Sequence, residues 1–257
     1  MRYHAPQPQD RRRQFHYRPP PANHPLLLSA PRSHAVLTRA PLPAVVDHRA
    51  AMLPIRNQGN EGACSGFSTA ANREAALALA GIQLPDYLSP AYLYARTRMA
   101  EGSFPQDAGA TIADEFGTLQ AYGVCPESFL PYAQDPSEAP TPTADVAARQ
   151  FRIGQPLAVD WSDPDNVKQV LASGRVVTIG FEVFQSFERT GPDGIVPDLL
   201  PDEPLLGGHG VLVVGYDDAN GWWIVRNQWG QGWGAAGYCF QRYGYEGLAW
   251  TEAWTAQ

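Results

Sequence analysis

A cysteine in a glycine-rich loop is the first residue of this sequence that could do chemistry. Cys64 lies in the run Gly62-Ala63-Cys64-Ser65-Gly66, at the start of a segment with helical spacing. Backbone N–H groups at a helix start carry positive partial charge, which stabilises a thiolate over a thiol. The thiolate is the nucleophilic form. A lone cysteine is more often a small buried apolar residue, so Cys64 needs a partner to count as a nucleophile.

His209 is the candidate partner, because it is the one histidine in the second half of the chain. Gly208 and Gly210 flank it at the start of an apolar run, which would leave its ring open to a cleft. A lone histidine is usually structural, but Asn227 follows at the end of a second apolar run. Its carboxamide could hydrogen-bond the imidazole and fix the ring plane. Trp229 could cover that bond and keep water away.

A glutamine ahead of Cys64 completes a set that resembles the papain and cathepsin family of cysteine peptidases. Gln58 precedes Cys64 by 64 − 58 = 6 residues, the spacing of the family's oxyanion glutamine. Cys64, His209 and Asn227 match the family's other three catalytic positions in order. Further similar blocks run over residues 42–49, 88–93 and 122–132, so the resemblance covers roughly residues 42 to 254.

The resemblance implies an α+β, papain-like fold with two lobes and an active-site cleft between them. The helical N-terminal lobe would span about 42–135 and an antiparallel, β-barrel-like lobe about 150–257, together forming a peptidase domain over 42–257. The sequence agrees, because helical spacing dominates the first half and short apolar runs with glycine and aspartate turns dominate the second.

The mechanism implied by the family is acyl transfer to water. Cys64 attacks the scissile carbonyl, and its backbone N–H and the Gln58 side chain hold the oxyanion. His209 protonates the leaving amine and then activates water, while Asn227 keeps the ring aligned. No metal or organic cofactor is implied, and no Cys/His cluster has zinc spacing. The expected partner is a peptide or protein substrate.

Substrate-binding residues are expected from the same resemblance. Backbone groups near Asp107 would bind an extended peptide, and the pocket for the second residue before the cut would be lined by Gly208 and the 250–252 region. Thr251 at its base would favour apolar side chains, whereas Glu252, if the register slips by one, would admit arginine. The full expected set is Asp107, Gly109, Ala110, Gly208, Trp229, Thr251 and Glu252.

The departures from the family concern cysteines and one aromatic residue. Glu61 stands where the family usually has a disulfide cysteine, and Ser65 where it has a tryptophan. Only three cysteines are present, so at most one disulfide could form. We interpret Cys125 and Cys239 as structural, in different lobes and unpaired. The sequence therefore resembles a disulfide-poor, bacterial type of the family.

Local signals give the expected elements. Ser89 suits an N-cap and Pro90 the first helical position of one helix. Residues 133–150, rich in Pro, Ala, Asp and Thr, are predicted to be the crossing between lobes. We expect helices at 64–80, 89–99, 110–121 and 163–174, an extended segment at 151–159, and strands at 176–183, 210–215, 222–226 and 237–241.

Residues 1–41 form a basic, proline-rich arm without helical or strand periodicity. The arm has seven basic residues and one acidic residue, about +6, and the body has 19 − 7 = 12 basic and 26 − 1 = 25 acidic residues, −13. Opposite charges favour docking, so we expect a short propeptide that lies over the cleft, crossing it in reverse or placing one of Pro19 to Pro21 near Cys64. The alternatives are a free targeting or export tail and, for Arg11 to Arg13, nucleic-acid binding, which lacks a supporting motif.

Composition and residue types argue against several other classes of protein. Apolar residues make up 44% and charged residues 18%, and no apolar run approaches the about 18 residues of a membrane span. No signal peptide is visible, so we expect a cytoplasmic protein or one exported by a non-classical route. Transglutaminase-like enzymes and amidases pair Cys-His with an aspartate, whereas this chain has Asn227. A non-catalytic, peptide-binding relative would lack one of the four residues.

Overall fold

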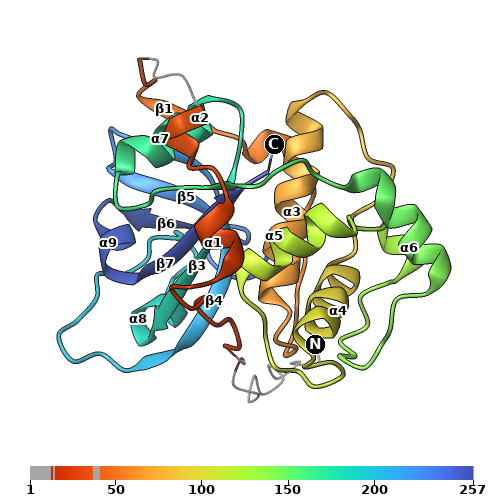
Figure 1. Ribbon diagram of the computed structural model, residues 1–257. Coiled ribbons are helices and arrows are strands. Elements are labelled where there is room, and N and C mark those ends of the chain that lie inside the picture. Colours follow the sequence, from red (N-terminus) through yellow and green to blue (C-terminus); the bar gives the residue numbers. More distant parts are fainter. Residues whose placement is uncertain (1–12, 14, 37–40, 257) are drawn as a thin grey trace, which may run out of the picture.

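Two lobes lie side by side in the computed structural model, which describes residues 13, 15–36 and 41–256 (Figure 1). Helices form one lobe and an antiparallel sheet forms most of the other. The expected α+β, two-lobe class is therefore confirmed. Arg11 and Arg12 lie outside the described residues, so the nucleic-acid alternative stays untested.

The helical lobe is built on α3 (Cys64–Leu79), α4 (Pro90–Glu101) and α5 (Ile112–Ala121), which confirms three expected helices. The Ser89 hydroxyl accepts the Tyr92 N–H at 3.0 Å, and Pro90 occupies the first turn of α4. Thr111 caps α5 in the same way. These side chains satisfy backbone donors that a helix start leaves open. The lobe also contains η1 (Arg49–Ala51) and η2 (Glu127–Phe129).

The sheet follows the order β2-β7-β3-β4-β5-β6, and β1 pairs with β4. All these pairs are antiparallel, but the path is open, so the expected barrel-like sheet does not close. The strands are β1 (Val45–Asp47), β2 (Leu157–Ala158), β3 (Val177–Phe184), β4 (Leu205–Asp217), β5 (Trp222–Arg226), β6 (Tyr238–Arg242) and β7 (Trp250–Thr255). Short helices α7 (Pro164–Ala172), α8 (Gln185–Glu188) and α9 (Tyr245–Ala249) flank it.

The structure adds to or changes the expected elements in three places. The segment 133–150 contains α6 (Pro142–Ala148), followed by η3 (Arg149–Phe151). Thr141 accepts the Ala144 N–H at 3.1 Å, so α6 begins with the same cap-and-proline signal as α4. The segment 151–159 is strand only at β2, because the rest of it turns between α6 and the sheet. Strand β7 was not expected, since its tryptophans and glutamate do not alternate as in an exposed strand.

The arm holds two short helices, α1 (Pro25–Ser29) and α2 (Ser33–Val36), although its sequence shows no helical periodicity. Leu26 and Leu27 of α1 pack against the apolar cluster that α5 shares. At α2, the Ser33 hydroxyl donates to Asn166 of α7 at 2.6 Å. In Figure 1 the arm, in red, crosses the front of the molecule where the two lobes meet.

Helix α3 joins the two lobes through a cluster of apolar side chains. Ala75 on α3 packs with Leu212 and Val214 of β4 and with Ile224 of β5.

Among the described residues, no helix is long and apolar enough to cross a membrane.

The three cysteines are buried and unpaired. Cys125 belongs to the apolar core of the helical lobe and Cys239 to that of the sheet lobe. We therefore predict three titratable thiols under denaturing, non-reducing conditions. A count of one would show that Cys125 and Cys239, or another pair, form a disulfide.

Candidate active site

Cys64 begins α3 with its helix start uncapped by any side chain. Ala63 is the N-cap residue and makes no side-chain hydrogen bond, so first-turn N–H groups stay available to an anion. Strand β4 packs closely against this turn, because a Cβ added at Gly210 would lie 3.4 Å from the Cys64 carbonyl carbon. The Gly210 and Ser65 N–H groups face the Cys64 sulfur. The neighbour of His209 thus touches the candidate nucleophile.

His209 lies on β4 with a fixed ring. Its Nε2 is 2.9 Å from Oδ1 of Asn227, and the same Oδ1 accepts the Gln228 backbone N–H at 2.9 Å. An atom that accepts an N–H is the amide oxygen, so Nε2 of His209 is the protonated nitrogen. In the neutral ring, Nδ1 is then the basic nitrogen that can receive a proton.

Aromatic rings enclose His209. Trp229 stacks on it with centroids 4.8 Å apart and an interplanar angle of 29°. Phe181 of β3 and Phe187 of α8 pack at 5.8 and 6.4 Å. The expected cover by Trp229 is present in this geometry. The two phenylalanines were missed because, in sequence, they look like ordinary core residues.

In this structure, with the arm docked, burial favours the neutral forms of both Cys64 and His209. Desolvation lowers the pKa of His209 to about 4 and raises the pKa of Cys64 to about 12. Both shifts follow from the loss of water around a charged form. The arm contributes at His209, because Phe15 packs 6.2 Å from the ring and the Arg13 charge lowers the pKa of His209 further. At Cys64 the arm acts in the other direction, because the Tyr17 N–H faces the sulfur and lowers the pKa of the thiol.

Gln58 lies in the loop before α3 and is buried. Its backbone N–H donates to the Gln228 carbonyl at 2.9 Å, and a bridge joins Asn57 to Trp229. The loop that carries Gln58 is thus tied to the loop that follows Asn227. The Gln58 Nε2 donates to the Glu61 carbonyl at 3.0 Å, and its Oε1 has no partner.

The expected substrate-binding residues surround a segment of the arm. Gly208 accepts the Tyr17 N–H at 3.2 Å, and Ala110 accepts the Arg18 N–H at 3.5 Å. At Gly109, whose φ is +68°, an added Cβ would lie 1.7 Å from the His16 carbonyl oxygen. These residues hold a peptide backbone by main-chain contacts on both lobes.

Asp107 and Thr251 have different partners in the site. The Asp107 carboxylate accepts the Gly62 N–H at 3.0 Å and the Tyr94 hydroxyl, so it braces the loop before Cys64. Thr251 contacts the Tyr17 hydroxyl at 2.7 Å.

Glu252 interacts with the Tyr17 hydroxyl in this pocket, but its carboxylate has other partners as well. It is fully buried, and its carboxylate accepts the N–H groups of Ile112 and Ala113 at 2.8 and 3.1 Å. It also accepts the Trp254 indole N–H at 2.7 Å. The carboxylate thus bonds the start of α5, where negative charge is favoured, while it also faces the occupant of the pocket.

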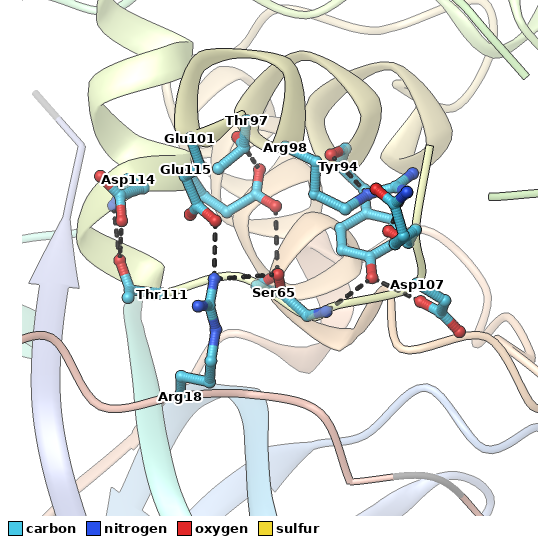
Figure 2. Close-up of polar contacts among 12 residues, drawn as sticks. Arg18, Ser65, Tyr94, Thr97, Arg98, Glu101, Asp107, Thr111, Asp114 and Glu115 are labelled. Carbon is cyan, nitrogen blue, oxygen red and sulfur yellow. Dashed lines mark hydrogen bonds and ion pairs between the residues drawn. The ribbon is translucent and has the colours of Figure 1, made fainter. Parts of the chain in front are cut away.

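A buried polar network replaces the tryptophan that is missing at Ser65. The Ser65 hydroxyl donates to Glu115 at 3.0 Å, and Thr97 donates to the other oxygen at 3.1 Å (Figure 2). Burial raises the pKa of Glu115 to about 8, and its charge in turn raises the pKa of Cys64. Sequence reasoning noted the gap at Ser65 but not what fills it.

Among the residues that the structure describes, no group of three or more His, Cys, Asp or Glu side chains could hold a metal ion.

Comparison with known proteins decides the family. The sequence model described as "Papain family cysteine protease" matches residues 42–250. The chain belongs to the papain family of cysteine proteases. The resemblance noted in the sequence is thereby confirmed.

The relatives show how far the likeness extends. Pro-cathepsin H of Bos taurus is 29% identical over 227 residues, 82% of this chain and 63% of that protein. A peptidase C1-like protein of Acanthamoeba polyphaga mimivirus is 31% identical over 181 residues, 65% of this chain and 57% of the viral protein. The matches thus span about three fifths of these relatives. The crystal structure of xylellain, a cysteine protease from Xylella fastidiosa, has a TM-score of 0.84 at 26% identity, covering 98% of this chain and 99% of that one.

The raised pKa of Cys64 predicts slow alkylation of the full chain. An acid whose pKa is raised stays protonated over a wider pH range, so at pH 8 the thiolate fraction falls from about a quarter for a free cysteine to roughly 10⁻⁴. Iodoacetamide should therefore modify Cys64 at least about 10²-fold more slowly than a small thiol. Mass spectrometry of peptides containing Cys64 gives the rate, and a rate equal to the free thiol would contradict the expectation.

Proposed function

We propose that this papain-family chain is a cysteine endopeptidase that hydrolyses peptide bonds through Cys64 and His209. The observation that carries the proposal is the fixed ring of His209: its Nε2 bonds Asn227 under Trp229, while the residue beside it touches Cys64 at the uncapped start of α3. This arrangement leaves Nδ1 as the proton acceptor for a thiol.

In the proposed reaction, Cys64 transfers its proton to His209 Nδ1 and the sulfur attacks the scissile carbonyl carbon. The Cys64 N–H and the Gln58 amide stabilise the oxyanion. The imidazolium returns the proton to the leaving amine, and the neutral ring then takes a proton from water, which hydrolyses the thioester. Asn227 holds the ring plane through both transfers.

The arm is proposed to inhibit the enzyme by filling its cleft. The segment from Phe15 to Arg18 bonds the sheet lobe at Gly208 and the helical lobe at Ala110. Three cationic or ionisable side chains of the arm meet acids of the body: Arg18 meets Glu101 at 2.6 Å, His24 meets Asp114 at 2.9 Å and His16 meets Asp107 at 3.8 Å. The Arg18–Glu101 pair agrees with the charge opposition that arginine and lysine give in the sequence.

The direction of the arm explains how it could escape cleavage. Phe15 and His16 lie beside His209 and Gly62, and Tyr17 follows them into the pocket near Thr251. In a substrate, the residue in the pocket for the second position precedes the cut. The arm thus runs opposite to a substrate, as one alternative from the sequence had it. The other alternative, a proline near Cys64, is not favoured, because Tyr17 supplies the backbone contact.

Pro-forms among the relatives support an inhibitory arm. The comparisons include pro-cathepsin H, which is matched in sequence, and the structure of digestive procathepsin L 3 of Tenebrio molitor, with a TM-score of 0.69 at 25% identity over 85% of this chain and 71% of that one.

Cys64→Ala and His209→Ala should each abolish hydrolysis of a fluorogenic peptide, and Gln58→Ala should lower the rate by roughly 10²–10³ as one oxyanion donor is lost. Cys125→Ala is the matched control, since its thiol lies in the core of the helical lobe. All variants are first compared with the wild type by circular dichroism. Wild-type rates in Cys64→Ala would refute the mechanism.

Removing the arm should raise kcat/KM by about tenfold or more, because a tethered peptide competes with substrate for the cleft. The measurement compares the full chain with a chain that begins at Leu42, both verified as folded by thermal melting. Equal kcat/KM values for two folded proteins would reject the inhibitory role.

A further inference from the structure

Two neighbouring side chains of the arm, Tyr17 and Arg18, occupy two distinct sites beside Cys64. Tyr17 is almost fully buried, and Arg18 extends its guanidinium to the helical lobe. Because the arm lies where a substrate is proposed to bind, these occupants indicate which side chains the two sites accept.

The Tyr17 site has room for an aromatic ring because two of its walls are glycine. A Cβ added at Gly180 of β3 would lie 2.1 Å from Cζ of Tyr17, and one added at Gly208 would lie 2.6 Å from its Cδ1. Any larger residue at these positions would fill space that the ring occupies. The site is therefore shaped for a flat, six-membered side chain.

The end of this site has a directed hydrogen bond for a phenol. The Thr251 hydroxyl donates its hydrogen to the Gly180 carbonyl at 3.0 Å, so towards Tyr17 Oη, 2.7 Å away, it can only accept. Tyr17 must then be the donor. Phenylalanine would leave this acceptor unpaired. Glu252 also interacts with the Tyr17 hydroxyl, while its carboxylate accepts the Ile112 and Ala113 N–H groups.

The Arg18 site is acidic and lies on α4 and the loop before α5. The guanidinium donates to Glu101 Oε2 at 2.6 Å and to the Gly109 carbonyl at 3.3 Å (Figure 2). Asp114 lies close to Glu101 and meets His24 of the arm. The other oxygen of Glu101 is buried without a partner. When the arm leaves, Glu101 loses the Arg18 guanidinium and Asp114 loses the His24 ring.

The direction of the arm determines the order in which a substrate would present the two side chains. The arm runs from Phe15 near His209, through Tyr17, to Arg18, whereas a substrate must run the other way so that the cut lies after the residue in the pocket. The residue facing Glu101 therefore precedes the tyrosine in a substrate.

We propose that the cleft selects peptides in which an arginine or lysine and then a tyrosine occupy the third and second positions before the cut. This inference rests on the proposed peptidase function and names its substrate class. Glu101 and Thr251 are the residues that set the two preferences.

The test uses the full chain carrying Tyr17→Gly and Arg18→Gly, which vacates both sites while leaving α1 and α2 in place. Coumarin amides of Arg-Tyr-Ala, Arg-Phe-Ala, Glu-Tyr-Ala and Tyr-Arg-Ala are compared by kcat/KM. We expect Arg-Tyr-Ala to exceed Arg-Phe-Ala by up to about tenfold, as for one hydrogen bond, and to exceed the other two by about tenfold or more. Equal values for Arg-Tyr-Ala and Arg-Phe-Ala, or a preference for Tyr-Arg-Ala, would overturn the inference.

Two matched variants in the same background assign the preferences. Thr251→Val should remove the advantage of tyrosine over phenylalanine while Arg-Phe-Ala is still cleaved, and Glu101→Gln should reduce the advantage of arginine over glutamate. Unchanged ratios in both would count against the proposed residues. If the double variant does not fold, Tyr17→Ala alone is used for the tyrosine site and Arg18→Ala alone for the acidic site.

A binding measurement separates this inference from the proposed function. The variant that also carries Cys64→Ala is titrated with fluorescein-labelled Arg-Tyr-Ala-Ala and Arg-Phe-Ala-Ala peptides, and anisotropy gives the two Kd values. Tighter binding of the tyrosine peptide without hydrolysis by the Cys64 protein would support the site and refute the peptidase. Hydrolysis with no preference would refute the site alone.

Discussion

The packing of α3 against β4 is the contact on which the rest of the structure depends. It joins the helical lobe to the sheet, through Ala75 against Leu212 and Val214, and at its end it sets the Cys64 turn against Gly210. Gly210 tolerates so close an approach because it has no side chain, and His209 is its neighbour on the same strand. A displacement of either element would separate the thiol from the ring that is proposed to deprotonate it.

Elements whose sequence signal lies within a few residues could be predicted, whereas contacts between distant residues could not. Ser89 and Pro90 predict the start of α4, but the same signal at Thr141 and Pro142 was overlooked inside a proline-rich segment. The order of Gln58, Cys64, His209 and Asn227 was visible because a family pattern relates distant blocks. Sequence alone could not show that Glu252 bonds the start of α5, since that contact joins residues about 140 positions apart.

Buried carboxyl groups stand at or beside Glu61 and Ser65, the two positions where the family resemblance implies a disulfide cysteine and a tryptophan. Glu115 fills the space beside Ser65, and burial raises the pKa of Glu61 to about 7. Both oxygens of Glu115 accept hydrogen bonds, yet burial raises the pKa of both acids, so the helical lobe combines an apolar core with groups whose charge changes near neutral pH. A chain without disulfides thus derives part of its specificity of packing from polar contacts.

The attachment of the arm through α1 and α2 has a consequence for how the proposed inhibition would end. Leu26 and Leu27 hold α1 on the body, and Ser33 holds α2, so the segment proposed to inhibit the enzyme is anchored independently of the chain that follows it. While the chain is intact, the segment faces the cleft at an effective concentration of the order of millimolar. Once the backbone is cut beyond α2, the same segment becomes a separate ligand, and its occupancy then depends on dilution. Activation would thus be a change of molecularity, reversed in concentrated protein and complete in dilute solution.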